Sequence, residues 1–391
     1  MTKEDNLSPM LLKNIESAAQ ILIANLAKPN FHIHIQIDSD CDGYTSAALL
    51  LNYINAVFPS AIENFSYSFH EGKKHGINLA KVPKETTLVI APDSSSNEYE
   101  IHELLYQKGV DVIVLDHHHA DKYSEYACVV NNQLCDYPTK SLSGVGIVYK
   151  FCQCLDYFLE QPDFVDQFID IVGIGLVGDM MSLQDFETRY LVEQGLLHIN
   201  NPFIKGMTEK NMYSLGSILT PIGVAFYIVP LINAITRVGT MEEKILLFES
   251  MLEYKAFEMI PSTKRGCSGQ QETRLSQSLR TCTNVKNRQT RNQDAAVEQV
   301  KAIIEEENLL EHKLLIIRLR QAAFDRGITG LIANKLMAEY QRPVALLIAT
   351  QTEDGLAWSG SARGYGKSSD LTDFRTFCEN SGLVLYAQGH S

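Results

Sequence analysis

Three carboxylates stand at alternate positions near the start of this 391-residue chain, at Asp38, Asp40 and Asp42. Like charges so close together repel one another, and a bound cation is the usual way to hold them. The string DSDCDG also opens a calcium loop, but that loop needs a Glu where this chain has Leu49. The run therefore predicts a metal site of another kind.

Acidic residues also follow three later apolar runs. Asp93 follows TTLVIAP, Asp116 begins the triplet Asp116-His117-His118 after VIVL, and Asp179 follows IVGIGLVG. Taken alone, Asp93 is equally consistent with a helix N-cap, and Asp179 with an ordinary residue at the end of a helix. The triplet is more specific, because a carboxylate and imidazoles together at the end of a strand are typical metal ligands.

The sequence around these residues predicts a mostly parallel sheet. From residue 31 to about 199, β-rich apolar runs alternate with helical patterns, as in βαβ units. The strand runs are FHIHIQI, TTLVIA and VDVIVL, and helical patterns begin at Tyr44, near Asn97 and at Val145. A parallel sheet collects functional residues at the carboxyl ends of its strands, so the acidic groups should meet at one edge.

Such a gathering of carboxylates with an imidazole suits two divalent ions, Mn²⁺ or Mg²⁺, better than zinc. Two ions about 3.5–4 Å apart activate a bridging water and clamp a phosphate during in-line displacement. Metal-dependent phosphoester hydrolysis is the chemistry that these residues favour.

The chain is long enough for two α/β domains. We expect the first domain over residues 1–240, a helical connector over 241–307 and a second, smaller α/β domain over 308–391. The stretch from about 270 to 307 has few apolar residues and no Pro. That composition predicts one long helix joining the domains, with an active cleft between them.

The net charge of −13 argues against indiscriminate binding to nucleic acid, whose phosphates are held mainly by Lys and Arg. One basic cluster, between residues 262 and 292, departs from this balance with seven bases and a single acid, Glu272. The bases are Lys264, Arg265, Arg274, Arg280, Lys286, Arg288 and Arg291. The cluster predicts either a surface that leads a strand toward the site or simply a solvated helix face.

Eight cysteines are scattered without a CxxC pair, so neither a zinc site nor a disulfide framework is indicated. The N-terminus lacks the features of a signal peptide, and the longest apolar run, Ile222–Ile235, is shorter than the ~20 residues of a membrane span. We therefore expect a cytoplasmic protein with no membrane partner.

In order and spacing, these motifs resemble those of the DHH phosphoesterase superfamily. DSDCDG resembles its first motif, Asp93 its second, Asp116-His117-His118 the triplet that names the superfamily, and Asp179 its fourth. Several other segments resemble the RecJ branch: Val130-Asn131, residues 142–146, 187–189 with 191–196, and 230–234 with Arg237. The second domain is similar to DHHA1 at residues 326–333, 342–343, 360–363 and 389–390.

The resemblance implies a role for each residue of the site. Two Mn²⁺ or Mg²⁺ ions would be bound by Asp38, Asp40, Asp42, Asp93, His117 and Asp179. Asp116, His117 and His118 form the catalytic triplet, in which His118 orients the site or stabilises the leaving phosphate and Asp116 fixes an imidazole. Substrate phosphates would be held by Arg237, Ser361, Arg363, His390 and His70.

Two departures from RecJ bear on the substrate. RecJ proteins usually carry an Arg before a GYG-like turn, but this chain reads HEGKKHG from His70 to Gly76. Recognition of the 5′ end would then be altered or passed to a lysine. The chain also ends at Ser391, where DHHA1 would continue and an OB-fold would follow. We expect a DHHA1-like domain that is incomplete at its C-terminus, and no OB-fold.

The RecJ resemblance implies a single-stranded-DNA-specific exonuclease that works 5′ to 3′ and releases 5′-mononucleotides in DNA repair, recombination and replication. Single-stranded DNA would be the substrate, and a single-strand-binding protein or a helicase would be a partner. A passage between the domains too narrow for a duplex would explain the choice of single strands.

Three other functions share the metal motifs. A DHH phosphodiesterase for short oligoribonucleotides or cyclic dinucleotides fits the acidic charge and the missing OB-fold, but not the RecJ-like PLINAITR segment. An inactive DHH scaffold that binds DNA or proteins has no physical need for so many gathered carboxylates. A DHH pyrophosphatase would leave the RecJ-like segments unexplained.

Overall fold

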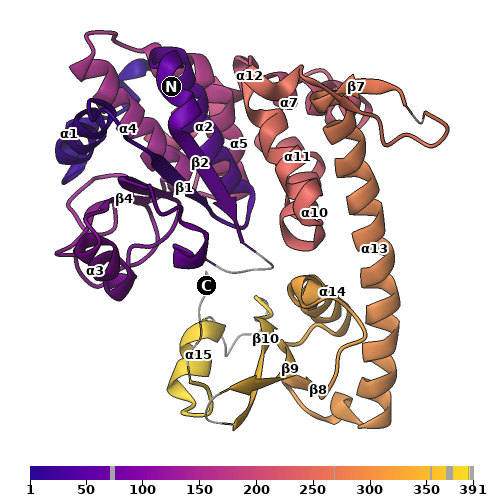
Figure 1. Ribbon diagram of the computed structural model, residues 1–391. Coiled ribbons are helices and arrows are strands. Elements are labelled where there is room, and N and C mark those ends of the chain that lie inside the picture. Colours follow the sequence, from indigo (N-terminus) through magenta and orange to yellow (C-terminus); the bar gives the residue numbers. More distant parts are fainter. Residues whose placement is uncertain (71–74, 268, 353–354, 367–372, 386, 388–391) are drawn as a thin grey trace. The chain divides into compact units, whose positions relative to one another are not determined.

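The computed structural model describes the whole chain except residues 71–74, 268, 353–354, 367–372, 386 and 388–391 (Figure 1). The chain divides into two units, Met1–Val285 and Lys286–Ser391. The division falls inside the predicted helical connector, within α13 (Arg274–Glu306). The long helix expected from the composition of this stretch is therefore present.

The first unit is built on a five-stranded sheet with the order β2-β1-β3-β4-β5. All neighbouring strands are parallel, and β1 matches β2 from Ile33 opposite Phe65 to Ile37 opposite Phe69. The strands are β1 Ile33–Ile37, β2 Phe65–Phe69, β3 Leu88–Pro92, β4 Asp111–Asp116 and β5 Cys128–Asn131. The parallel sheet and its three predicted strands are confirmed, while β2 and β5 are not among the predicted strands.

The helices of this unit before α13 are α1 Ile15–Leu26, α2 Cys41–Val57, α3 Tyr99–Gln107, α4 Gly144–Phe158, α5 Ile169–Gly178, α6 Phe186–Leu197, α7 Pro202–Lys210, α8 Met212–Leu215, α9 Pro221–Tyr227, α10 Val229–Val238, α11 Met241–Met251 and α12 Glu253–Ala256. Helices α1 to α4 pack on the strands of the sheet, and the remaining helices of the unit pack on other helices. A short hairpin of β6 (Met259–Pro261) and β7 (Gln271–Thr273) precedes α13.

Alternating side chains give the sheet two apolar faces. Ile33, Ile35 and Ile37 of β1 lie in a large core with residues of α2, α4 and α5. On the opposite face, Val89 of β3 lies in a smaller core with Leu105 of α3. Both faces are therefore covered, as a parallel sheet requires.

The second unit contains a three-stranded mixed sheet with the order β10-β9-β8. Its elements are β8 Leu315–Leu319, α14 Thr329–Tyr340, β9 Val344–Thr352, β10 Gly355–Arg363 and α15 Phe374–Asn380. β8 pairs with β9 in parallel and β9 with β10 antiparallel. The fold class is confirmed as α/β, with a larger parallel sheet and a smaller second one.

An apolar helical run in the first unit, Pro221–Val238, is long and apolar enough to cross a membrane by length and composition alone, with 18 residues and a mean hydropathy of 1.5. Core helices of soluble proteins can be equally long and apolar, and α10 packs like a core helix. Ile232 and Ile235 are buried, and Asn233 accepts a hydrogen bond from the backbone N–H of Cys41 at 3.0 Å. The packing favours a core helix, and the expectation of no membrane span stays a prediction.

A buried ion pair fastens the N-terminal segment to the helices around the sheet. Lys150 of α4 and Glu187 of α6 lie 2.6 Å apart, and their side chains are 0% and 1% exposed. Lys150 also donates to the carbonyl of Leu7 at 2.7 Å, and Glu187 accepts from the N–H of Leu7 at 3.0 Å and from the Tyr137 hydroxyl at 2.9 Å. These partners offset the cost of removing both charges from water.

Replacing Lys150 with Met should destabilise the protein by about 3–5 kcal/mol, because Glu187 would stay buried without its counter-charge. Chemical denaturation followed by circular dichroism measures this change. Lys28→Met is the matched control, since Lys28 pairs with Asp111 on the surface, where ion pairs contribute about 0–1 kcal/mol. Equal losses in the two variants would contradict the role assigned to the buried pair.

Candidate metal centre

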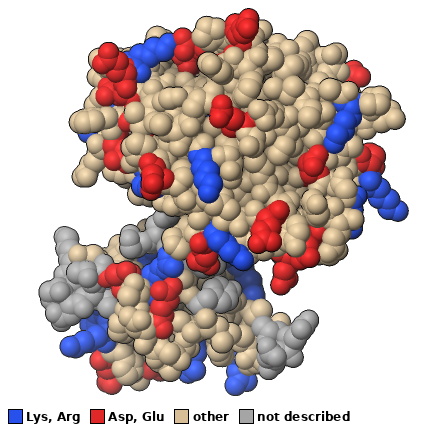
Figure 2. Space-filling model, turned by 90° about the vertical axis from the view of Figure 1, so that its left-hand side faces the viewer, with Lys and Arg blue, Asp and Glu red and all other residues tan. Residues whose placement is uncertain are grey.

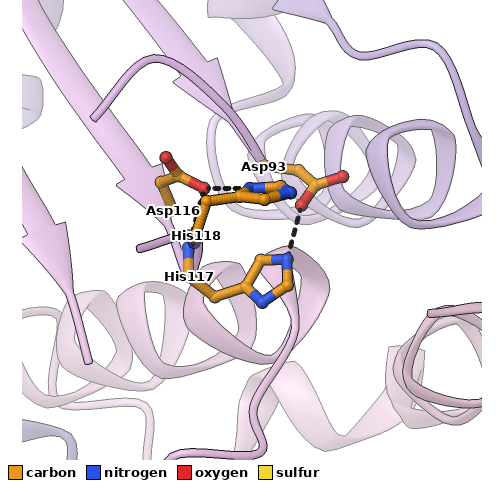
Figure 3. Close-up of side chains that lie close together, drawn as sticks. All are labelled: Asp93, Asp116, His117 and His118. Atoms are coloured by element: carbon orange, nitrogen blue, oxygen red, sulfur yellow. Dashed lines mark hydrogen bonds and ion pairs between the residues drawn. The ribbon is translucent and has the colours of Figure 1, made fainter. Parts of the chain in front are cut away.

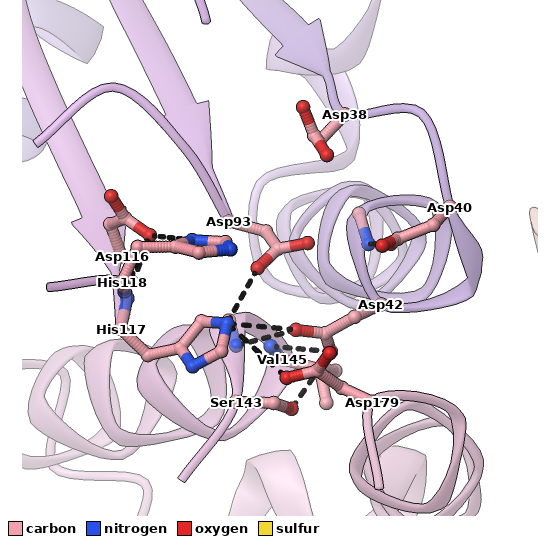
Figure 4. A network of polar contacts seen from close by, with 12 residues as sticks. Asp38, Asp40, Asp42, Asp93, Asp116, His117, His118, Ser143, Val145 and Asp179 are labelled. Atoms are coloured by element: carbon pink, nitrogen blue, oxygen red, sulfur yellow. Dashed lines mark hydrogen bonds and ion pairs between the residues drawn. The ribbon is translucent and has the colours of Figure 1, made fainter. Parts of the chain in front are cut away.

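The carboxyl ends of β1, β3 and β4 and the C-terminal end of α5 bring the predicted acidic residues together (Figure 4). His117 lies among them: its Nε2 is 3.2 Å from Asp93 Oδ1, 3.4 Å from Asp179 Oδ2 and 3.9 Å from Asp42 Oδ2. Asp42, Asp93 and His117 are buried. Residues far apart in the sequence thus share one dry site at the sheet edge.

The possible ligand atoms form three groups, and within each group all atoms lie within 4.8 Å of one another. The groups are Asp93, Asp116, His117 and His118; Asp42, His117 and Asp179; and Asp38, Asp40 and Asp93. Because Asp93 and His117 each belong to two groups, the groups form one continuous site. All six residues predicted as metal ligands lie in it.

Donors at two helix starts hold the carboxylates of the first motif. Asp42 accepts hydrogen bonds from the Ser143 hydroxyl at 2.8 Å and from the next two backbone N–H groups at 2.6 and 3.1 Å, where α4 begins. Asp40 is the N-cap of α2 and accepts from the Gly43 N–H at 3.1 Å. Helix N-termini carry partial positive charge, so the two helix starts place favourable electrostatic potential at these carboxylates.

Two glycines allow the backbone to approach these carboxylates closely. A Cβ at Gly43 would lie 2.6 Å from the Cβ of Asp38, and a Cβ at Gly144 would lie 2.4 Å from Oδ1 of Asp93. Asp93 itself has a φ of 66°, in the left-handed region that costs energy for residues other than glycine. Strain at the residue that meets His117 is typical of a functional site.

Asp116 is buried and holds His118 in place (Figure 3). Its Oδ1 accepts hydrogen bonds from His118 Nδ1 and the His117 N–H, both at 2.8 Å, and its Oδ2 accepts from the Ser96 N–H at 3.0 Å. Burial alone would raise the pKa of Asp116, but the hydrogen bond and charge of His118 bring it below its usual value. The pairing outweighs burial at His118 and raises its pKa to about 9. Asp116 therefore acts on an imidazole, as the sequence predicts.

Burial raises the pKa values of Asp38, Asp42, Asp93 and Asp179, and the charges of neighbouring carboxylates add to the effect. Burial and then the charge of Asp42 raise the pKa of Asp179 to about 8 and that of Asp93 well above its usual value. Burial raises the pKa of Asp42 to about 6 despite the hydrogen bonds it accepts.

Two oxygens of the cluster mark where positive charge is needed. Asp93 Oδ1 and Asp179 Oδ2 are buried, and neither receives a hydrogen bond from the described residues. Buried carboxylate oxygens without donors are costly, and a cation between them would remove that cost. This set of oxygen donors with one imidazole fits the divalent ions predicted from sequence.

His75 is a site residue that the sequence prediction does not include. Its Nδ1 is 2.8 and 3.0 Å from the two carboxylate oxygens of Asp38, and this contact raises the pKa of His75. The side chain of Asp38 is 1% exposed and that of His75 is 60% exposed. The sequence feature that could have indicated this contact is the HEGKKHG segment. Its spacing does not show which of its basic residues contacts Asp38.

The predicted phosphate-binding residues are divided between the two units. In the first unit, Arg237 is half-buried on α10. His70 is buried at the end of β2, with its Nε2 3.2 Å from Gln36 Nε2 and its carbonyl accepting from Lys244 at 3.0 Å. Burial lowers the pKa of His70 to about 4, so this residue is neutral at physiological pH.

In the second unit, Ser361 and Arg363 of β10 lie beside the start of α14. Ser361 Oγ is 2.9 Å from Thr329 Oγ1, and Arg363 Nη2 would lie 2.8 Å from a Cβ placed on Gly330. Hydroxyls and a guanidinium beside a small residue suit phosphate oxygens. The remaining predicted residue, His390, lies outside the described residues.

Three bases of the predicted basic cluster are engaged in ion pairs. Arg280 donates two hydrogen bonds of 2.7 Å to Glu272, and Lys264 lies 3.4 Å from the same carboxylate. Arg274 pairs with Glu258 at 2.6 Å. On the face drawn in Figure 2, basic and acidic side chains of the larger unit are likewise interspersed. Arg280 of α13 thereby holds Glu272 of β7, and the pairing of all three bases leaves less positive charge for nucleic acid.

Comparison with known proteins relates most of the residues of this centre to a known family. Residues 31–176 match the DHH family, N-terminal domain. The chain is 40% identical over 385 residues to a Bacillus subtilis (strain 168) protein provisionally named SPbeta prophage-derived single-strand DNA-specific exonuclease YorK, covering 97% of this chain and 65% of that protein. It is 24% identical over 395 residues to the single-stranded-DNA-specific exonuclease RecJ of the same strain, covering 98% of this chain and 46% of the relative.

Among solved structures, exonuclease RecJ bound to manganese is similar with a TM-score of 0.69 and 21% identity, over 88% of this chain and 81% of that one. RecJ of Thermus thermophilus in complex with Mg²⁺ has a TM-score of 0.65 and 19% identity, over 100% of this chain and 50% of the other. These likenesses show a RecJ-like fold. The chain spans 65% of the length of YorK and about half that of the Bacillus subtilis RecJ.

Gly144→Ala should weaken Mn²⁺ binding about 10–100-fold, because the new Cβ would displace the Asp93 carboxylate. Calorimetric titration with Mn²⁺ measures the effect. Gly146→Ala in the same helix is the control, since its Cβ would meet only Leu142 and Leu176, at 3.2 Å and beyond. Equal binding by both variants would show that close packing at Gly144 does not shape the site.

Without metal, the contribution of Asp179 to stability should be lost as pH rises from about 4 to about 8. A carboxyl with a raised pKa is protonated in the folded state where the unfolded chain is already ionised, so its contribution is lost as pH rises through that window. In Asp179→Asn, the decrease in the free energy of unfolding between pH 5 and pH 8 should be about 1–3 kcal/mol smaller than in the wild type. Denaturation in EDTA at the two pH values measures this difference. An unchanged difference between the two pH values would mean that Asp179 ionises without cost.

Proposed function

Because this chain belongs to the DHH family and is homologous to the RecJ and YorK exonucleases, we propose that it is a metal-dependent exonuclease specific for single-stranded DNA. It degrades the strand from 5′ to 3′ and releases 5′-mononucleotides. The observation that carries the proposal is the position of buried oxygens of Asp93 and Asp179, which lack hydrogen-bond donors among the described residues, beside His117. A purely structural role does not account for them, because such oxygens cost stability.

The metal centre would hold two divalent ions, Mn²⁺ or Mg²⁺, through Asp38, Asp40, Asp42, Asp93, His117 and Asp179. When bound, the ions supply an activated water and neutralise charge on the attacked phosphate. The α2 and α4 N-termini orient the carboxylates of Asp40 and Asp42 before any ligand arrives. Such preorganisation lowers the cost of reaching the transition state.

His118 protonates the leaving group in this proposal. The water oxygen bonds to phosphorus, and the bond from phosphorus to the 3′ oxygen of the terminal nucleotide breaks, so the phosphate remains on the shortened strand. His118 is partly exposed and charged at neutral pH, with Nδ1 fixed by Asp116. Its Nε2 then donates the proton that the leaving 3′ oxygen requires.

Substrate phosphates would be contacted by Arg237 and, in the second unit, by Ser361 and Arg363. Arg237 lies in the last turn of α10, and the same helix accepts the Cys41 N–H through Asn233. The guanidinium is therefore carried by an element that contacts the first metal motif. His70 is less suited to this role, because it is buried and uncharged at neutral pH.

We place this activity in the cytoplasm, on single strands exposed during repair, recombination or replication, with a single-strand-binding protein or a helicase as partner. One observation favours the rival substrate class of short oligoribonucleotides or cyclic dinucleotides. The pairing of Lys264, Arg274 and Arg280 with acids leaves fewer free cations for a long strand. The two proposals therefore differ in substrate length.

Digestion of end-labelled substrates with Mn²⁺ tests the proposal. A 5′-labelled single strand should release its label as mononucleotide from the start, a 3′-labelled strand should release its label only at the end, and duplex DNA should resist. Cleavage confined to short RNA or cyclic dinucleotides would establish the rival instead. Failure to cleave any substrate would indicate a binding scaffold.

The two ends of β4 provide a matched pair of variants for this assay. Asp116→Asn should lower activity about 10–100-fold, because His118 would lose its charged partner. Asp111→Asn, at the exposed start of the same strand, should leave activity unchanged. Similar activity in the two variants would exclude the role assigned to the Asp116–His118 pair.

A further inference from the structure

A long uncharged segment runs over the surface of the first unit. The 26 residues from 211 to 236 contain no Asp, Glu, Lys, Arg or His, in a chain of which 21% is Asp, Glu, Lys or Arg. Large apolar side chains in this segment are nevertheless exposed. They are Met212, Tyr213, Ile218, Ile222, Phe226 and Tyr227. Exposed apolar side chains that gather in one region usually mark a binding site.

The orientation of α9 explains this exposure. Ile222 and Phe226 are four positions apart and therefore share one face of the helix, where they are 72% and 71% exposed. Gly223 and Val224 lie on the opposite face, where Val224 is fully buried in the core. α9 contacts α8, which carries the fully exposed Tyr213. We call the set of Tyr213, Ile218, Ile222 and Phe226 the α8–α9 surface.

The α8–α9 surface is close to the metal centre. Val229, about one helical turn beyond Phe226, lies 3.8 Å from the position of a Cβ on Gly178, the residue before Asp179. On the other side of Asp179, Met180 is 87% exposed and has a φ of 58°. The end of α9 that carries Phe226 therefore lies near the C-terminal end of α5, where Asp179 follows Gly178.

We propose that the α8–α9 surface stacks the unpaired bases of a single strand whose backbone reaches the metal centre. The inference rests on the proposed function, which makes a single strand the substrate. Aromatic side chains stack on bases of any sequence, because every base has a π-face. A duplex keeps its bases stacked inside, so the surface selects single strands.

Charge supports a nucleic acid as the occupant. The uncharged segment places no carboxylate beside a passing phosphate, although the chain carries a net charge of −13. The same helical run ends at Arg237, which offers a guanidinium to the backbone. Bases on an aromatic surface with phosphates on a nearby cation are the usual arrangement for single-strand binding.

Binding without metal tests the surface separately from hydrolysis. Fluorescence anisotropy of labelled oligo(dT) of 20 nucleotides, in EDTA, should show affinity reduced about five- to a hundredfold in Phe226→Ser and in Tyr213→Ser. Tyr157→Ser is the matched control, because Tyr157 of α4 is also 71% exposed but lies outside the α8–α9 surface. Oligo(dT) of two nucleotides and duplex DNA should be bound alike by all four proteins.

Several outcomes would overturn the proposal. Unchanged affinity for the 20-mer in both α8–α9 variants would show that the bases do not stack there. If those variants instead lose self-association in light scattering, or lose binding to phosphatidylcholine vesicles, while oligo(dT) binding persists, the surface serves another copy or a membrane. Loss of hydrolysis by the wild type with normal oligo(dT) binding would remove the proposed function but leave this surface intact.

Discussion

The mutual repulsion of carboxylates in a dry site is the constraint on which the first unit depends. Asp38, Asp42 and Asp93 are almost fully buried, and burial together with neighbouring charge raises the pKa of each. Folding must therefore supply positive potential at this edge. It does so with the N-termini of α2 and α4 and with the charged imidazole of His118, and bound cations would complete the compensation.

The rest of the architecture serves this edge. A parallel sheet ends its strands at one side, so β1, β3 and β4 deliver their acidic residues to a common place. Gly43 and Gly144 let the starts of α2 and α4 approach the site carboxylates closely. Asp93 has a left-handed backbone conformation, which turns its carboxylate toward the site. The apolar run of α9 and α10 packs beside α2 and α5, and α9 exposes the aromatic residues Phe226 and Tyr227.

Much of the site was predictable, because its residues directly follow the strands. Apolar runs before Asp38, Asp93 and Asp116 indicated strand ends, and parallel topology then required those ends to meet. β2 and β5 escaped prediction because FSYSF contains no aliphatic residue and CVVN is only four residues long. His75 escaped prediction because it contacts Asp38 from a distant segment, and no periodic pattern in the sequence relates the two segments.

The sequence alone determined the two α/β units, the metal motifs and the resemblance to the DHH superfamily, since these depend on local periodicity and on the order of short segments. Tertiary structure decided what each charge and apolar group does. It committed Lys264, Arg274 and Arg280 to acidic partners, buried His70 in a neutral form and left Phe226 exposed beside the site. The physical reason is that solvation and pairing depend on neighbours distant in the chain, which periodicity does not encode.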